Sequence, residues 1–322
     1  MFKGVRLWVA ASSVLAMLLL ASCGGGQQVQ KYVPTRIVSF GDEASVITDA
    51  GLKYTNNGIK DLTTTGNVVT IDCTLNPIWN QIVAQYYGLV FPQCNPTSVA
   101  TSNLIFAANG AKVADVTAQI DAFLGQPNVF TSSTLVTMLA GQNDVLEQYA
   151  LVKAGTVTEA DAEAAVGLAG SAMADQVNRV GLAGAKVLIS TVADVGTTPF
   201  GLAENTATPG RAAFLSLLTS RFNSKLRVGL INDGKMTGLV LSDESISSGV
   251  KNPGVTFVDV TTPVCDPAKA ATLLDCNTST LIAAASASTG DPWLWADQLH
   301  LSSGGQRVVG NLAVTRATGN PF

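Results

Sequence analysis

The chain is poor in histidine, in charged residues and in aromatic residues. Its 322 residues include one histidine, 13% charged residues and 6% aromatic residues. A single histidine, with no cysteines at a metal-type spacing, argues against a zinc site. There is no basic cluster and no interleaved aromatic stripe, which argues against binding to nucleic acid.

The rest of the composition is that of a compact protein. Hydrophobic residues make up 47% of the chain, and the formal net charge is −4. Low charge and positive mean hydropathy favour a compact secreted protein over a disordered one. A mature chain of this length can bury a large core, so one domain is expected.

The N-terminus has the features of a targeting segment. Lys3 and Arg6 precede an apolar stretch, Leu7 to Leu20, that is too short to span a bilayer convincingly. Residues 20–23, Leu-Ala-Ser-Cys, resemble a bacterial lipobox, in which Cys23 would be lipidated. Gly24 follows where an inner-membrane retention signal would have aspartate, so the resemblance favours the outer membrane. An ordinary signal peptide with a chance cysteine is the alternative.

These features divide the chain into three parts. We expect a lipoprotein signal peptide over residues 1–22, a flexible linker over 23–34 and one domain over 35–322. The membrane is then a partner through the lipid anchor on Cys23, at the periplasmic or surface face of the outer membrane. Nothing in the sequence fixes the oligomeric state.

Four further cysteines suggest disulfide bonds, since an even number is typical of an exported chain. They are Cys73, Cys94, Cys265 and Cys276. Three pairings are possible. We favour Cys73–Cys94 and Cys265–Cys276, because each pair brackets one local loop. The alternative is free buried cysteines.

Short apolar runs alternate along the chain with stretches of helical apolar spacing. The runs predict strands at 36–40, 103–108, 135–140, 186–191 and 255–260, and the stretches predict helices at 77–87, 113–124, 158–182, 212–230 and 304–315. Such alternation is typical of a parallel sheet covered on both faces. Ligands in such folds bind beyond the carboxyl ends of the strands.

The single histidine stands close to the C-terminus, three residues after an aspartate. Asp297 can hold one ring nitrogen of His300 and leave the other facing a reacting group. This pair is a typical oriented general base. Three polar segments follow predicted strands and are expected near it: Gly41-Asp42-Glu43, Asn109-Gly110 and Gly141-Gln142-Asn143.

Several segments, in their order and spacing, resemble the blocks of the GDSL or SGNH family of ester hydrolases. They are Phe40-Gly41-Asp42, residues 106–112, Gly141–Asp144, residues 191–199, residues 261–265 and residues 297–305. The resemblance covers nearly the whole mature chain and is strongest to the branch of autotransporter esterases and lecithinase-like lipases. It implies a three-layer α/β/α sandwich with a mostly parallel, flavodoxin-like sheet.

The resemblance also implies roles for individual residues. Asp297 and His300 would be the acid and base of the triad. Asn143 would donate its side-chain amide to the oxyanion, and a backbone N–H at Asn109 would be a second donor. Hydrolysis without a metal or organic cofactor is the implied reaction, on a small-molecule or lipid ester.

One position departs from the family. The nucleophilic serine of the family directly follows Gly-Asp, and this chain has Glu43 there. Three accounts compete: ester hydrolysis has been lost, or Glu43 itself acts as a carboxylate nucleophile or as a base for water, or a nearby hydroxyl, on Ser45 or Ser39, takes over. We therefore expect a membrane-anchored carboxylic-ester hydrolase, or else a non-catalytic lipoprotein that binds a ligand in the inherited cleft.

Overall fold

The computed structural model describes residues 31–62, 69–231, 234–286 and 288–319. Within them, the chain from Val33 onward forms one compact unit with its own hydrophobic core and two disulfide bonds. A unit of this kind is expected to fold on its own. The predicted signal peptide and Cys23 lie outside the described residues. None of the helices in the described ranges is both long and apolar enough to cross a membrane.

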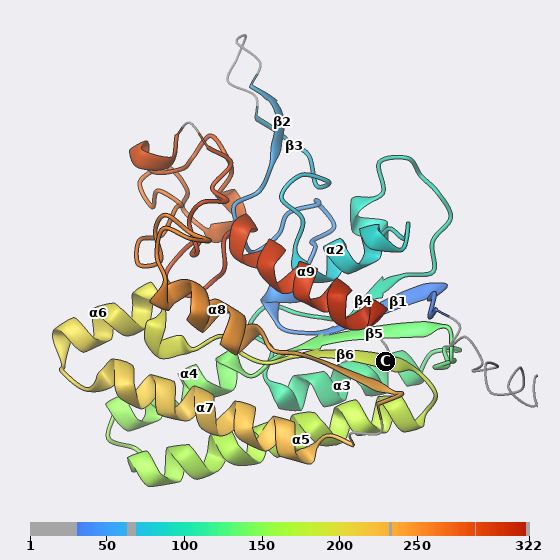
Figure 1. Cartoon of the computed structure of the whole chain (residues 1–322), viewed down its shortest axis with the longest axis horizontal. Coiled ribbons are helices and arrows are strands. Elements are labelled where there is room, and N and C mark those ends of the chain that lie inside the picture. Colours follow the sequence, from blue (N-terminus) through green and yellow to red (C-terminus); the bar gives the residue numbers. More distant parts are fainter. Residues whose placement is uncertain (1–30, 63–68, 232–233, 287, 320–322) are drawn as a thin grey trace, which may run out of the picture. The chain divides into compact units, whose positions relative to one another are not determined.

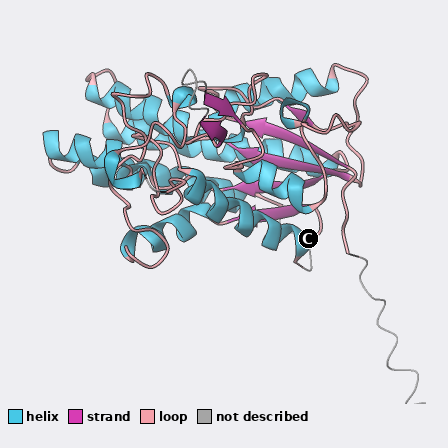
Figure 2. Ribbon diagram, turned by 90° about the horizontal axis from the view of Figure 1, so that it is seen from above, coloured by secondary structure: helices cyan, strands magenta, loops and turns pink. Residues whose placement is uncertain are grey.

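The centre of the unit is a five-stranded sheet in which every neighbouring pair is parallel (Figure 2). The strand order is β4-β1-β5-β6-β7. The strands are β1 (Arg36–Gly41), β4 (Leu104–Ile105), β5 (Thr134–Leu139), β6 (Lys186–Ser190) and β7 (Thr237–Val240). Numbered along the chain within this sheet, the order is 2-1-3-4-5, which is the flavodoxin-like order. The predicted fold class is confirmed.

Helices cover both faces of the sheet (Figure 1). One layer holds α3 (Val113–Leu124), α4 (Gln142–Lys153), α5 (Glu159–Leu182) and α7 (Arg211–Gly229). The other holds α2 (Trp79–Tyr86) and α9 (Ser303–Thr318), with α8 (Ser242–Lys251) packed on α9, while α6 (Pro199–Ala207) packs on α7. The strands β1, β5 and β6 are almost entirely buried because both faces of the sheet are covered.

Smaller elements surround this core. The strands β2 (Ile59–Leu62) and β3 (Val69–Ile71) form a separate two-stranded antiparallel sheet. Short 3-10 helices span Glu43–Ser45, Pro92–Cys94, Val195–Thr197, Leu273–Asp275 and Ala283–Ala285. Disulfides join Cys73 to Cys94 and Cys265 to Cys276, which confirms the predicted pairing.

The fifth predicted strand is wrong. Residues 255–260 form turns and one isolated bridge, between Asp259 and Trp293, and β7 at Thr237–Val240 is the fifth strand instead. Val255 and Val258 are 83% and 63% exposed, whereas Phe257 and Val260 are buried, so the segment is not covered on both faces as an inner strand would be. The strand predicted at 103–108 is shortened to the two residues of β4, and the other predicted strands and helices are present with small shifts at their ends.

Candidate active site

The site begins at a sharp turn at the carboxyl end of β1. Gly41 has φ 138°, and a Cβ there would collide with the carbonyl oxygen of Leu139 on β5. The side chain of Gln119 on α3 fixes this peptide from both sides: its Oε1 accepts from the Gly41 N–H at 2.8 Å and its Nε2 donates to the Gly41 oxygen at 2.9 Å. Only glycine fits here, and the turn aims the next residues out of the sheet.

Asp42 and Glu43 follow this turn and are both buried. The Oδ1 atom of Asp42 accepts from the Ala44 N–H at 3.1 Å and so caps the 3-10 turn at Glu43–Ser45. Burial, with the neighbouring Glu43 carboxylate, raises the pKa of Asp42 well above its ordinary value. Asp42 is therefore a positioning residue, and Glu43 carries the charge that faces the site.

One oxygen of Glu43 accepts two hydrogen bonds from groups on two other segments of the chain. Oε2 accepts from the Gly110 N–H at 2.9 Å and from Asn143 Nδ2 at 3.1 Å. Burial would raise the pKa of Glu43, but the hydrogen bonds from His300, from its own backbone N–H and from Gly110 outweigh burial and lower it. Glu43, which is 4% exposed, is thus held as a carboxylate.

The other oxygen of Glu43 faces the histidine. Oε1 lies 3.3 Å from His300 Nε2, and His300 Nδ1 lies 2.9 Å from each oxygen of Asp297. Burial opposes the charge on the ring, but the hydrogen bonds and charges of Asp297 and Glu43 raise the pKa of His300 to about 10. His300 is therefore an imidazolium between two carboxylates at neutral pH.

Asp297 is held in place by the turn that leads to His300. Its Oδ1 accepts from the backbone N–H groups of Leu299 at 2.8 Å and of His300 at 2.7 Å. Burial would raise the pKa of Asp297, but the hydrogen bond and the charge of His300, together with these backbone bonds, lower it. The short spacing from Asp297 to His300 thus builds an orienting carboxylate from one local loop.

The structure places most of the predicted site residues together. Asn143 donates to Glu43 and, at 3.1 Å, to the carbonyl of Ala111, so its amide faces the site rather than capping α4. The backbone donor to Glu43 is Gly110, one residue after the predicted Asn109. The order of the blocks located this loop, but the sequence did not show which of its backbone N–H groups faces Glu43.

The two hydroxyls considered as substitutes for serine are bound elsewhere. Ser45 Oγ accepts from Trp79 Nε1 at 3.0 Å. Ser39 Oγ lies 2.7 Å from Thr137 Oγ1 and accepts from Asn80 Nδ2 at 3.0 Å. Both are completely buried in packing contacts, so neither is placed to act in the site.

Two cavities border the site. A small one of about 40 Å³ is lined by Glu43, His300 and Trp295, among others. A larger, mostly apolar one of about 400 Å³ lies beside Asp297 and is lined in part by Leu273 and Ile282. Within the described part of the chain, no three His, Cys, Asp or Glu side chains gather to hold a metal ion.

Comparison with solved structures finds several similar folds. A lipolytic G-D-S-L family protein from Veillonella parvula is 8% identical, with a TM-score of 0.40 and coverage of 87% of this chain and 96% of that one. An α/β hydrolase from the Lake Arreo metagenome is 16% identical, with a TM-score of 0.43 and coverage of 90% and 98%. An acetylxylan esterase from Geobacillus stearothermophilus is 16% identical, with a TM-score of 0.41 and coverage of 90% and 97%.

Sequence comparison gives the family directly. No curated protein matches the chain. Residues 37–313, however, match the sequence profile of the GDSL-like lipase/acylhydrolase family. This match spans β1 with Gly41-Asp42-Glu43, both donors to Glu43, and the turn from Asp297 to His300. The chain belongs to the GDSL-like lipase/acylhydrolase family.

Proposed function

We propose that this chain hydrolyses carboxylic esters with Glu43 as the nucleophile in place of serine. One observation carries the proposal: the two oxygens of Glu43 have different partners. Oε2 is held by the Gly110 N–H and Asn143, whereas Oε1 faces His300 Nε2. A carboxylate needs no base to become nucleophilic, and here one oxygen is anchored while the other points to a proton donor.

In the first step, Oε1 of Glu43 attacks the carbonyl carbon of the ester. A bond forms between Oε1 and the acyl carbon, the bond to the alcohol oxygen breaks, and a mixed anhydride remains on Glu43. His300, which starts as an imidazolium, gives its Nε2 proton to the leaving alcohol oxygen. The histidine therefore begins the cycle as an acid, which is the reverse of its role beside a serine.

The second step follows from the loss of charge on Glu43. The anhydride is neutral, so one of the two carboxylates that raise the pKa of His300 is gone, and the ring becomes a base for water. Water attacks the carboxyl carbon of Glu43, whose Oε2 is held by Gly110 and Asn143, and these donors stabilise the oxyanion. The bond to Oε1 then breaks. The acyl group leaves as a carboxylic acid, Glu43 is again a carboxylate and His300 is again protonated.

The cavities support an ester with an apolar part. The mostly apolar cavity beside Asp297 has the size of a small-molecule site. The small cavity beside Glu43 and His300 has room for water. We propose an acyl or lipid ester as the substrate class.

We also propose that the protein is a lipoprotein of the bacterial outer membrane, anchored through Cys23. The support is the lipobox-like sequence that ends at Cys23 and the stretch of glycine and glutamine that follows it. Metabolic labelling with a palmitate analogue tests the anchor: the intact chain is expected to be labelled, and Cys23→Ser is expected not to be. Equal labelling of both would contradict the anchor.

A second candidate function is a ligand-binding lipoprotein that has lost hydrolysis. The same carboxylate favours this function. Glu43 accepts hydrogen bonds from its own backbone N–H, from the Gly110 N–H and from Asn143, so these donors are not available to a substrate carbonyl. A fixed negative charge there would also repel a developing oxyanion.

An esterase assay distinguishes the two candidate functions. It measures hydrolysis of p-nitrophenyl esters of short and medium chain length by the unit Val33–Phe322. We expect wild-type hydrolysis above background, and at least about a hundredfold loss in Glu43→Gln and in His300→Ala. Glu163→Gln, at a half-exposed glutamate of α5, is the matched control and is expected to keep the wild-type rate. If wild type is inert and Glu43→Ser hydrolyses the esters, the second candidate holds instead.

A further inference from the structure

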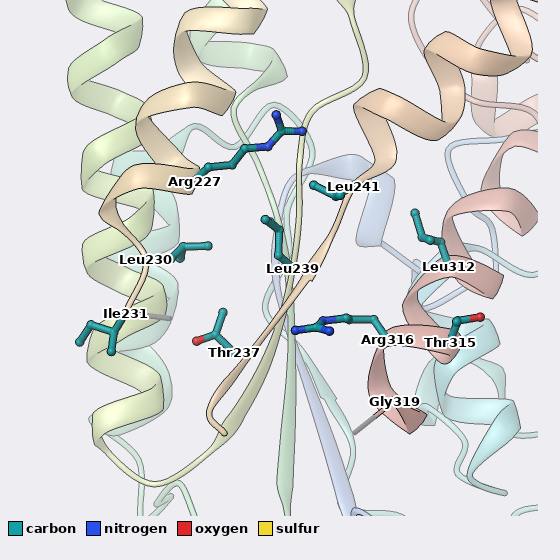
Figure 3. A pocket seen from close by; sticks show the side chains of 10 residues that line it. All are labelled: Arg227, Leu230, Ile231, Thr237, Leu239, Leu241, Leu312, Thr315, Arg316 and Gly319. Carbon is teal, nitrogen blue, oxygen red and sulfur yellow. The ribbon is translucent and has the colours of Figure 1, made fainter. Parts of the chain in front are cut away.

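A groove lies at the β7 edge of the sheet, away from the residues around Glu43. It has a volume of about 600 Å³ and is lined by the end of α7, by β7 and by α9 (Figure 3). Its apolar wall includes Leu230 just after α7, Leu239 in β7, Leu241 just after β7 and Leu312 on α9. Among the described residues that line it, Arg227 and Arg316 are the charged ones, and none is acidic. The groove therefore combines an apolar wall with two guanidinium groups.

The two arginines differ in how their charge is compensated. Arg227 Nη2 contacts Asp243 at 2.8 Å and Glu244 at 3.0 Å, so two carboxylates on α8 neutralise it. Arg316 forms no ion pair within the described residues. The Nε atoms of both arginines are shielded from solvent without a hydrogen-bond acceptor. In Figure 3 the side chain of Arg316 extends from α9 across the groove towards Thr237 and Leu239. One uncompensated guanidinium therefore points into an apolar space.

An uncompensated charge beside apolar walls is costly, and an anionic ligand group would offset this cost. A guanidinium fork matches the two oxygens of a carboxylate. The four leucines match an alkyl chain, and the volume lies in the range of small-molecule sites. A second copy or an extended peptide on the β7 edge would not by itself compensate Arg316.

We propose that this groove binds the anion of a single-chain fatty acid, with the carboxylate on Arg316 and the alkyl chain against the leucines. The proposal does not depend on the chemistry of Glu43, because none of the lining residues belongs to the hydrogen-bonded set around Glu43 and His300. The groove is a binding site separate from the site of hydrolysis.

Calorimetric titration of the unit Val33–Phe322 with dodecanoate, at pH 8 and below its micellar concentration, tests the proposal. We expect saturable binding of one dodecanoate per chain. Arg316→Gln is expected to weaken this binding about tenfold, as the loss of a charge-assisted hydrogen bond does. Arg307→Gln is the matched control, because Arg307 lies on the same helix, pairs with Asp291 and does not line the groove. It is expected to bind as wild type does.

Two further titrations test the proposal if Arg316→Gln does not fold. Leu312→Asn is expected to weaken dodecanoate binding, and methyl dodecanoate, which has no charge, is expected to bind wild type more weakly than dodecanoate. The absence of saturable binding, equal binding by Arg316→Gln, or equal binding of the methyl ester would overturn the proposal. So would a concentration-dependent dimer that Arg316→Gln abolishes, since the occupant would then be a second copy.

Discussion

Glu43 Oε1 lies 3.3 Å from His300 Nε2, where the resemblance of the sequence to its family predicts a serine hydroxyl. This contact is between a carboxylate and an imidazolium, because Asp297 holds the opposite ring nitrogen at 2.9 Å. Replacing a neutral hydroxyl by a carboxylate therefore changes the histidine as well as the nucleophile. The ring becomes a proton donor at neutral pH, and the chemistry has to start from that state.

The protonation state of His300 can be read without assignment, because the chain has one histidine. Its pKa is raised to about 10 by Asp297 and Glu43. We predict that the ring resonances in NMR spectra stay those of an imidazolium at pH 8 and change only as the pH approaches 10. Titration near the ordinary value of 6.5 would contradict the carboxylate-imidazolium contact.

Removing the charge of Glu43 should lower the pKa of His300. In Glu43→Gln the ring keeps Asp297 but loses one of its two carboxylate partners. The same NMR titration is predicted to move to lower pH than in wild type. Glu163→Gln serves as the control and should leave it unchanged, and a Glu43→Gln titration identical to wild type would show that Glu43 does not act on the ring.

The histidine also makes stability depend on pH. A group whose pKa is raised on folding stabilises the protein fully below its unfolded pKa, and this contribution is lost as the pH rises through the folded pKa. For His300 the contribution is present below about 6.5 and lost through about 10. The difference in the free energy of unfolding between wild type and His300→Gln should therefore narrow from pH 7 to pH 10.5. A difference that stays constant in urea unfolding would be inconsistent with this pKa.

Asn143 should matter to the rate more than to the fold. Its amide donates to Glu43 Oε2 at 3.1 Å, where the oxyanion of the second step would form. We predict that Asn143→Ala slows ester hydrolysis about a hundredfold. Asn178→Ala, at an exposed amide that bonds the backbone of Gly229, is the control and should leave the rate unchanged. Equal rates in Asn143→Ala and wild type would remove Asn143 from the mechanism.

The first disulfide should stabilise the unit through the unfolded chain. Cys73 and Cys94 are 21 residues apart, and closing such a loop contributes about 3 kcal/mol in the chain-entropy model. The double substitution Cys73→Ser and Cys94→Ser is predicted to lower the free energy of unfolding by about this amount. Denaturant unfolding measures this loss. Adding reductant to the double variant should then lower the free energy of unfolding further, by the contribution of the Cys265–Cys276 disulfide alone.

Much of the fold follows from local sequence. The apolar run that ends at Gly41, and the helical spacing from Val113 to Leu124, lie in the structure where the pattern predicts them. The position of the fifth strand could not be predicted from local sequence. The strand β7 is only four residues long and contains Gly238, whereas Val255 and Val258 lie in a stronger strand pattern but are exposed. Burial, not local pattern, decides between two such segments.

The site was predictable in its members but not in its contacts. Asp297 and His300 are joined by a short local turn, so their pairing could be inferred from spacing. Glu43 accepts hydrogen bonds from both Gly110 and Asn143 because the ends of three separate strands meet at the site. No local sequence pattern encodes this meeting. Similarly, Arg227 pairs with α8 whereas Arg316 has no ion pair among the described residues, a difference that only the packing of α7, α8 and α9 reveals.

The most direct test of the central claim follows an oxygen atom. The unit Val33–Phe322 would turn over an ester once in ¹⁸O-labelled water, and the peptide that contains Glu43 would be analysed by mass spectrometry. If Glu43 is the nucleophile and water attacks its carboxyl carbon, that peptide gains ¹⁸O while the acyl product of this first turnover does not. Label in the acyl product, with none on Glu43, would contradict the account.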